Sequence, residues 1–207
     1  MIKKVAKPIL NFLEKNGVKH EILEHRLVFT AQDKAATLKI DEKQVVKSVV
    51  VKLDARNYGL VSVPSNKNLD LKKLKELINK KRKKSGEKAA GKIEFAKEAW
   101  FKKNLKNSEP GAVFPFGVFY KLPHFLDAAL FKQKFLIINS GSNWQSVKIT
   151  PAQLAKTESA FLEKGSFSAA KPKKPKKKKV KNPKSPAGVT IFRPCLRRAC
   201  APSNPAG

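Results

Sequence analysis

Lys47 is the first residue in the sequence whose surroundings suggest chemistry. It is a single cation within a run of valines that extends from Val45 to Val51. An ammonium in such apolar surroundings either extends outward to solvent or is held at the floor of a pocket, where it can stabilise negative charge. Residue type alone leaves both arrangements open, because most lysines at a strand edge are solvated.

A second candidate is the segment Gly111–Gly117, in which two glycines bracket Pro115 and two phenylalanines. Glycine allows a ligand to approach the backbone closely, and proline stiffens the loop so that its N–H groups keep fixed positions. Such a loop could cradle a carboxyl, a carbonyl or a ribose. The alternative is a buried turn that Phe114 and Phe116 pack into the core.

A third candidate is the polar turn Asn139–Asn143, which follows the most apolar segment of the chain. Polar groups at the end of a buried strand often face a ligand. The same sequence is also typical of an ordinary hairpin, because Gly141 lies between two serines.

Conventional catalytic motifs are not recognisable in the sequence. It contains no P-loop, no Gly-x-Ser-x-Gly elbow and no evident Ser/His/Asp or Cys/His set. The only cysteines are Cys195 and Cys200, near the C-terminus, and the three histidines lack acidic partners at metal-ligand spacing. We therefore expect neither a covalent hydrolase nor a metal site, and His124 is typical of a packed or capping residue.

Periodicity and capping signals predict the elements that position these residues. The expected helices cover 8–16, a segment beginning at Thr30, 71–84, 93–105 and 151–164. The expected strands cover 18–24, 45–53, 58–63, 134–140 and 147–149. Lys47 thus falls where a helical turn passes into a β-branched strand.

This mixture of strands and helices predicts a single α/β or α+β domain over residues 1–165. From residue 166 onward the composition changes to a tail, 166–207, and the segment from Lys171 to Val180 consists almost entirely of lysine and proline. Such a segment cannot bury apolar surface and its charges repel one another, so we expect it to be disordered.

The charge of the chain is strongly positive. The 45 Lys and Arg residues against 16 Asp and Glu residues give a net charge of +29, and residues 171–207 contain no acidic side chain. This balance favours a polyanionic partner such as nucleic acid, although a lysine-rich surface can also serve solubility alone. No apolar stretch is long enough for a membrane span and no secretory signal is recognisable, so we expect a cytoplasmic protein without a membrane partner.

Together the three candidate segments resemble one family. The motifs appear in the order Val46-Lys47-Ser48-Val49, Gly111-x-x-x-Pro115-Phe116-Gly117, Leu126-Asp127, Ile138-Asn139-Ser140-Gly141 and Thr150-Pro151-Ala152-Gln153. In this order they resemble the YbaK / prolyl-tRNA-synthetase-associated domain family of stand-alone aminoacyl-tRNA editing deacylases. The opening segments around Gly17 and Phe29 fit the family as well, so the resemblance covers about residues 8–160.

The resemblance implies an α/β fold with a mixed, curved sheet flanked by helices. It implies hydrolysis of the ester between a wrong amino acid and tRNA, without a metal or another cofactor. The residue equivalent to Lys47 would be essential for catalysis. Substrate-binding residues implied by the resemblance are Gly111, Ala112, Val113, Phe114, Pro115, Ser140, Gly141, Asp127 and His124. Water would attack the ester, and the protein would orient it and stabilise the developing charge.

Partners follow from the same resemblance and from the charge. Mischarged tRNA would be the substrate, with a small amino acid on tRNA for proline as the best guess, and an aminoacyl-tRNA synthetase is a candidate partner. The basic run Lys80, Lys81, Arg82, Lys83 and Lys84 and the lysine-rich tail would contact the tRNA backbone without sequence specificity. In a eukaryotic host, Pro175 to Val180 would also fit a nuclear-import signal.

Two other classes of function compete with this interpretation. A catalytically inactive RNA- or ribosome-binding protein could keep the same fold, but the intact Lys47 and Gly111–Pro115 loop argue against it. A DNA-binding regulator has little support, because the sequence contains no helix-turn-helix or zinc-finger pattern and hence no DNA-specific site.

Overall fold

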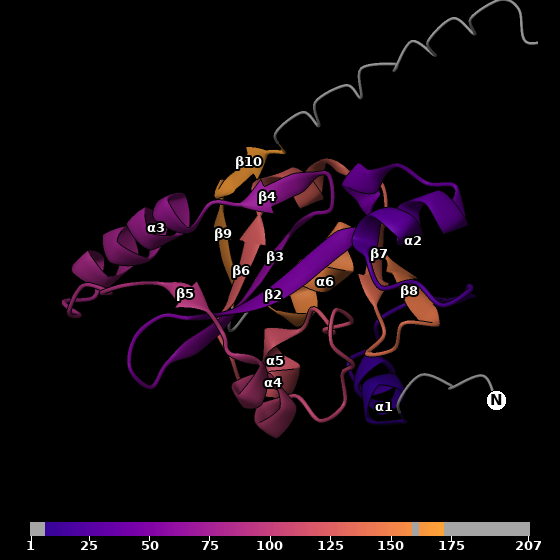
Figure 1. Cartoon of the computed structure of the whole chain (residues 1–207), viewed down its shortest axis with the longest axis horizontal. Helices are drawn as coiled ribbons and strands as arrows, with labels where there is room; N and C mark the ends of the chain where they lie inside the picture. Colours follow the sequence, from indigo (N-terminus) through magenta and orange to yellow (C-terminus); the bar gives the residue numbers. More distant parts are fainter. Residues whose placement is uncertain (1–6, 159–161, 172–207) are drawn as a thin grey trace, which may run out of the picture. The chain divides into compact units, whose positions relative to one another are not determined.

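Three sheets and the helices packed on them make up the described part of the chain in the computed structural model, which describes residues 7–158 and 162–171 (Figure 1). The α-helices are α1 (Lys7–Lys15), α2 (Ala31–Leu38), α3 (Leu71–Lys84), α4 (Glu98–Asn104), α5 (Gly117–Tyr120) and α6 (Pro151–Thr157), and the 3₁₀ helices are η1 (Glu42–Gln44) and η2 (Ala128–Lys132). The strands are β1 (Glu21–Glu24), β2 (Val46–Lys52), β3 (Tyr58–Pro64), β4 (Lys67–Leu69), β5 (Glu94–Phe95), β6 (His124–Asp127), β7 (Leu136–Asn139), β8 (Gln145–Ile149), β9 (Leu162–Gly165) and β10 (Ser168–Ala170).

The central sheet has five strands in the order β5-β2-β3-β6-β9. β2 is antiparallel to both of its neighbours, β5 and β3, whereas β3, β6 and β9 run parallel, so the sheet is mixed. β1, β8 and β7 form an antiparallel second sheet, and a bridge between Val45 and Ile137 joins the two sheets just before β2. This arrangement confirms the expected mixed α/β fold.

The helices cover opposite faces of the central sheet. α3 packs Leu74 and Ile78 against Val51, Val61 and the rest of one apolar cluster. On the other face, α1 and α6 join a larger cluster built around Phe114, Phe116 and strands β7 and β8. α2 packs on the second sheet through Ala35, which contacts the cluster that includes Val45 and Ile137.

Capping residues account for several helix starts. Thr30 accepts a hydrogen bond from the Asp33 N–H and thereby begins α2, as its sequence predicts. Thr150 and Gln153 form a capping box with Pro151 in the first turn of α6.

Two predicted helices differ in the structure. The helix expected over 151–164 ends at Thr157, and Leu162–Gly165 instead form β9 beside β6. The helix expected over 93–105 is divided: Glu94 and Phe95 pair with the end of β2 before α4 begins at Glu98. In both places pairing with an available sheet edge outweighs helix propensity, which is a weak preference.

The folded unit also extends past the boundary expected at residue 165. Phe167 is fully buried, and β10 pairs with β4 in an antiparallel register. Phe167 belongs to the apolar cluster against which α3 packs, and its burial there explains why the residues after 165 remain part of the folded domain. The expected disorder of the lysine-rich segment concerns residues that, apart from Lys171, lie outside the described ones. Within the described residues no helix is long and apolar enough to cross a membrane.

Candidate active site

A cavity of about 450 Å³ lies beside the first half of β2. β5 pairs only with Val51 and Lys52, so it leaves this part of the β2 edge open. The cavity is lined from α2 and the segment before it, from β2, from the Gly111 loop and from the turn after β7. Its polar lining residues are Thr30, Gln32, Lys34, Lys47, Ser48, Ser65, Asn68, Asn139, Asn143 and Lys171. Among these described lining residues none is acidic, so the cavity favours an anionic or electron-rich ligand.

Lys47 lies in this cavity, on β2. Its side chain is half-buried, and burial lowers its pKa from the ordinary value, with a smaller contribution from the positive charge of Lys171. Lys171 itself pairs with Glu42 at 3.3 Å. The structure thus places Lys47 at a pocket, one of the two arrangements that its apolar neighbours allowed.

A second ammonium, that of Lys34 on α2, lines the same cavity. Its Nζ atom donates a hydrogen bond to Oδ1 of Asn139 at 2.5 Å, and the side chain is only 4% exposed. Burial lowers the pKa of Lys34 to about 8. A lysine has three N–H donors. With Lys171, which also lines the cavity, the site therefore has three lysines rather than the single one that the sequence indicated.

Of the Gly111–Pro115 segment, only Gly111 lines the cavity. It adopts φ +82°, which favours glycine, and its carbonyl accepts a hydrogen bond from Nδ2 of Asn139 at 3.4 Å. The side chains of Ala112, Val113, Phe114 and Pro115 are buried in the core instead. Phe114 packs edge-on against Phe12 and Phe119. These four residues position Gly111 and do not line the cavity themselves.

Ser140 and Gly141 form the turn that follows β7, but neither lines the cavity. Ser140 is fully buried and donates to the carbonyl of Gln145 at 2.7 Å. Gly141 has φ +82° and packs so tightly that a Cβ atom there would lie 2.5 Å from the carbonyl oxygen of Asn107. The cavity is lined by Asn139 and Asn143 on either side of this turn. The expected binding turn is therefore present, with its asparagines at the cavity.

Asp127 and His124 also lie away from the cavity, contrary to the binding role expected from the resemblance. Asp127 is 1% exposed and accepts hydrogen bonds from the N–H groups of Ala129, Phe167 and Ser168. It thereby caps η2 and holds the segment before β10 in place. Three backbone donors leave this carboxylate little capacity for a ligand.

His124 is fully buried and belongs to a hydrogen-bonded chain of side chains. Its Nδ1 lies 2.8 Å from Oε2 of Glu158, and its Nε2 lies 2.9 Å from Oγ of Ser62. Ser62, His124 and Glu158 thus form a hydrogen-bonded set that the sequence motifs do not reveal, although its serine is fully buried and does not line the cavity. Its members are 96 residues apart in sequence, so that no local motif reveals them.

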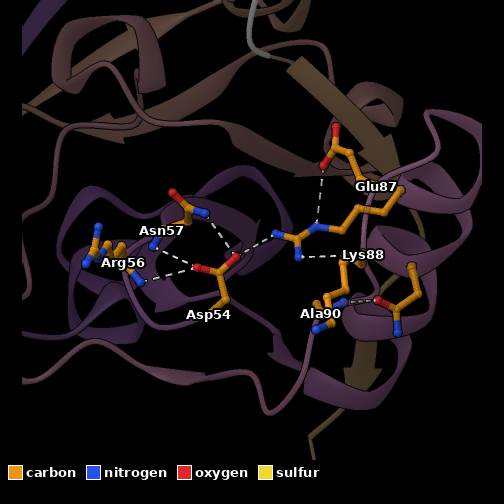
Figure 2. A network of polar contacts seen from close by, with 8 residues as sticks. Asp54, Arg56, Asn57, Glu87, Lys88 and Ala90 are labelled. Carbon is orange, nitrogen blue, oxygen red and sulfur yellow. Dashed lines mark hydrogen bonds and ion pairs between the residues drawn. The ribbon is translucent and has the colours of Figure 1, made fainter.

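The basic run at the end of α3 is divided between two roles. The side chain of Arg82 is only 16% exposed and pairs with Asp54 at 3.0 Å. It also pairs with Glu87 and donates a hydrogen bond to the carbonyl of Lys88 (Figure 2). Hydrogen bonds from Asn57 and Arg82 hold the pKa of Asp54 well below its usual range. Arg82 therefore ties α3 to the β2–β3 turn.

The other members of this run are lysines at the surface. Lys81 pairs with Glu163 of β9. Lys80, Lys83 and Lys84 are exposed. These three lysines keep the capacity to contact a polyanion that the sequence predicted for all five residues.

The comparison with protein families gives a clear match. The aminoacyl-tRNA editing domain model matches residues 25–157, which include Lys34, Lys47, Gly111 and Asn139. The chain belongs to this family, and the resemblance drawn from its motifs is confirmed. Membership implies aminoacyl-tRNA deacylase activity in general, with tRNA as the substrate class.

Solved structures share the fold. A candidate trans-editing enzyme for prolyl tRNA synthetase is 21% identical, with a TM-score of 0.65 over 82% of this chain and 100% of its own. A hypothetical protein is 19% identical, with a TM-score of 0.65 over 79% of this chain and 100% of its own. A candidate signal transduction protein from Marinobacter aquaeolei VT8 is 14% identical, with a TM-score of 0.56 over 80% of this chain but 31% of its own. No curated protein sequence matches significantly.

Proposed function

We propose that this protein is a trans-editing deacylase that hydrolyses the ester between a small amino acid and a mischarged tRNA, with Lys47 in the central role. The observation that carries the proposal is the position of Lys47 at a cavity that Gly111 and Asn139 also line. A volume of about 450 Å³ is within the range of about 300–1,000 Å³ typical of small-molecule sites, and so has room for the aminoacylated end of a tRNA.

The charge of the cavity suits the chemistry of ester hydrolysis. When water attacks the ester carbonyl, negative charge develops on the carbonyl oxygen. An ammonium that is already in place and partly desolvated stabilises this charge without reorganisation of solvent. We assign this role to Lys47. Lys34 is held by Asn139 and would orient the substrate through its remaining donors.

The substrate's own ribose assists this reaction. The vicinal hydroxyl of the terminal ribose can hydrogen-bond the attacking water, so the protein needs no nucleophile of its own. Orientation of the ester against this water would supply much of the acceleration. No cofactor enters the proposed reaction.

The fold comparison indicates which tRNA to test first. A candidate trans-editing enzyme for prolyl tRNA synthetase shares the fold, and we therefore propose tRNA for proline as the first tRNA to test. We propose the cytoplasm as the place of action, with an aminoacyl-tRNA synthetase as a candidate partner.

The test is hydrolysis of a panel of mischarged tRNAs by wild type, by Lys47→Ala and by Lys43→Ala. Lys43 is an exposed lysine on η1 that pairs with Asp41 outside the cavity, so its variant controls for the loss of a positive charge. We expect selective hydrolysis that persists in Lys43→Ala and disappears in Lys47→Ala. Salt-dependent tRNA binding without hydrolysis of any substrate would instead favour an inactive RNA-binding protein on this fold.

A further inference from the structure

Four side chains form a continuous chain of hydrogen bonds through the central sheet. Oγ of Ser48 lies 2.8 Å from Oγ of Ser62, which lies 2.9 Å from Nε2 of His124. Nδ1 of His124 lies 2.8 Å from Oε2 of Glu158. Ser48, Ser62 and His124 stand on the adjacent strands β2, β3 and β6, and Glu158 follows the end of α6.

The donors of this chain point in one direction. Glu158 accepts hydrogen bonds from the N–H groups of Gly117 at 2.9 Å and Val118 at 3.2 Å, so both of its carboxylate oxygens act as acceptors. Because Nδ1 of His124 faces this carboxylate, we assign the single hydrogen of a neutral imidazole to Nδ1, and Nε2 is then the acceptor. Ser62 consequently donates to His124, and Ser48 donates to Ser62.

One end of the chain reaches the cavity and the other is sealed from solvent. Ser48 follows Lys47 directly and lines the same cavity. Ser62, His124 and Glu158 are each 0% exposed. Because Ser48 donates its own hydrogen inward, its oxygen lone pairs remain available to accept a hydrogen bond from a molecule in the cavity.

This arrangement is costly for a purely structural element. Burial of polar and ionisable groups destabilises a core relative to apolar residues of the same shape, even when the groups are hydrogen-bonded. The rest of this sheet face is apolar: Val46, Val50, Leu60 and Leu126 are all buried there. A polar chain through an otherwise apolar core, with one end at a cavity, indicates a function at that cavity.

We propose that Ser48, Ser62, His124 and Glu158 form a proton relay that removes a proton from the water attacking the ester. This inference rests on the proposed deacylase function. It assigns Ser48 as the group that touches the water, whereas the other three residues act through it.

The proposed step balances in atoms and charge. Water forms its bond to the ester carbonyl carbon and passes a proton to Oγ of Ser48, while Ser48 passes its own to Ser62 and Ser62 passes its own to Nε2 of His124. The imidazolium that forms is paired with Glu158. When the tetrahedral intermediate collapses, the bond to the ribose oxygen breaks and the proton returns along the relay to that oxygen. The products are the free amino acid and the tRNA hydroxyl.

The charges around His124 are compatible with this role. Glu158 is its direct contact, and the strands and helix packed around it carry six further charged or titratable side chains: Lys47, Lys52, Tyr58, Tyr120, Glu163 and Lys164. Glu163 is paired with Lys81, and Lys164 lies over the ring of Phe131.

The experiment compares single-turnover hydrolysis by wild type, Ser62→Ala, Ser62→Thr and Ser108→Ala on the tRNA substrate that wild type prefers. Ser62→Ala removes the middle of the relay but keeps Lys47 and the His124–Glu158 pair. Ser62→Thr restores a hydroxyl on a β-branched residue that suits a strand. Ser108→Ala is the matched control, because it removes a hydroxyl–hydroxyl bond to Tyr120 outside the cavity and the relay.

We expect the rate of Ser62→Ala to fall by about 10²-fold, the lower end of what a positioned base contributes. The rate of wild type should rise with pH and then level off once the relay is unprotonated, whereas the rate of Ser62→Ala should keep rising with hydroxide. Ser62→Thr should recover the plateau, and Ser108→Ala should match wild type. A plateau unchanged in Ser62→Ala would overturn the relay.

A measurement on wild type alone covers the case in which Ser62→Ala does not fold. The rate in mixtures of H₂O and D₂O should depend on the deuterium fraction with a curvature that requires more than one proton in motion. A linear dependence would contradict the relay while leaving the deacylase function standing. If wild type hydrolysed no charged tRNA at all, the proposed function would fail and the relay with it.

Discussion

Nζ of Lys34 and Oδ1 of Asn139 are 2.5 Å apart in the cavity that also holds Lys47. The contact joins α2 to the end of β7, and Asn139 extends it to the carbonyl of Gly111. A helix, a strand and the glycine loop are thus connected at the candidate site through one buried lysine. The arrangement keeps a cation in a desolvated position, which a functional site requires and which stability alone does not favour.

Replacement of Lys34 by methionine should therefore stabilise the protein most at neutral pH and below. The folded-state pKa is about 8, below the ordinary 10.5, so folding is penalised while Lys34 is charged. A shift of this size corresponds to about 3 kcal/mol, less about 1 kcal/mol for the lost hydrogen bond to Asn139. Below pH 8 both folded and unfolded states are protonated and the penalty is fully present.

The lowered pKa of Lys34 also determines how the stability difference changes with pH. Between about pH 8 and 10.5 the unfolded chain holds the Lys34 proton more tightly than the folded one, so wild-type stability rises with pH relative to the variant. The free-energy advantage of Lys34→Met should shrink across this window. Urea unfolding at pH 7, 9 and 10.5 measures it, and a difference that stays constant with pH would show that burial does not depress this pKa.

Gly141 should tolerate no side chain. Its φ of +82° is strained for other residues, and a Cβ atom would lie 2.5 Å from the Asn107 carbonyl, so Gly141→Ala should lower the free energy of unfolding by about 2–4 kcal/mol. Gly86→Ala is the control, because Gly86 has φ +70° but open space around it, and about 1 kcal/mol is expected there. Equal losses in the two variants, measured by thermal unfolding, would rule out the predicted clash.

The two roles of the basic run at the end of α3 can be separated. Lys83→Ala should weaken tRNA binding and reduce the slope of log affinity against log salt by about one, because a phosphate contact is lost. Arg82→Ala should lower stability instead, because loss of the guanidinium leaves the carboxylate of Asp54 without its ion-pair partner. Salt titrations of tRNA binding, together with urea unfolding, test both. An unchanged slope in Lys83→Ala would remove this end of α3 from the RNA interface.

Features that depend on neighbouring residues can be predicted from the sequence, whereas contacts between residues distant in sequence cannot. The strand containing Lys47, the capped starts of α2 and α6 and the glycine turns follow from propensity, capping and periodicity. Lys34 was not recognisable, because Asp33-Lys34 on a short helix is typical of a solvated surface, and its burial depends on Asn139, 105 residues later. β9 and β10 were missed for a similar reason: their pairing depends on partners distant in sequence.

Residue types were also misleading where packing decides orientation. Of the glycine loop only Gly111 reaches the cavity, because its aromatic residues are buried in the core. The resemblance implies a binding role for His124. In the structure His124 pairs with Leu60 in the sheet register, and its ring contacts Ser62 inside the core instead of the cavity. Alternation along a strand gives a residue's face, but it does not show which face borders a cavity.

Phe29 should contribute to binding of the tRNA end rather than to the chemical step. It is an aromatic side chain with 66% exposure that lines the cavity, immediately before the cap of α2, and its carbonyl lies beside Gly111. An exposed ring at the mouth of a nucleic-acid site provides a face on which a base can stack, and such stacking is worth about 1–3 kcal/mol. Phe29→Ala should therefore raise KM by about 5- to 150-fold and leave kcat nearly unchanged, since 1.4 kcal/mol corresponds to a factor of ten.

Phe95→Ala is the matched control, because Phe95 is another exposed ring, on β5 and outside the cavity lining. Steady-state kinetics with a mischarged tRNA distinguishes the two variants. A fall in kcat without a change in KM would place Phe29 in the chemical step instead, and identical behaviour of both variants would indicate that no base stacks at this position.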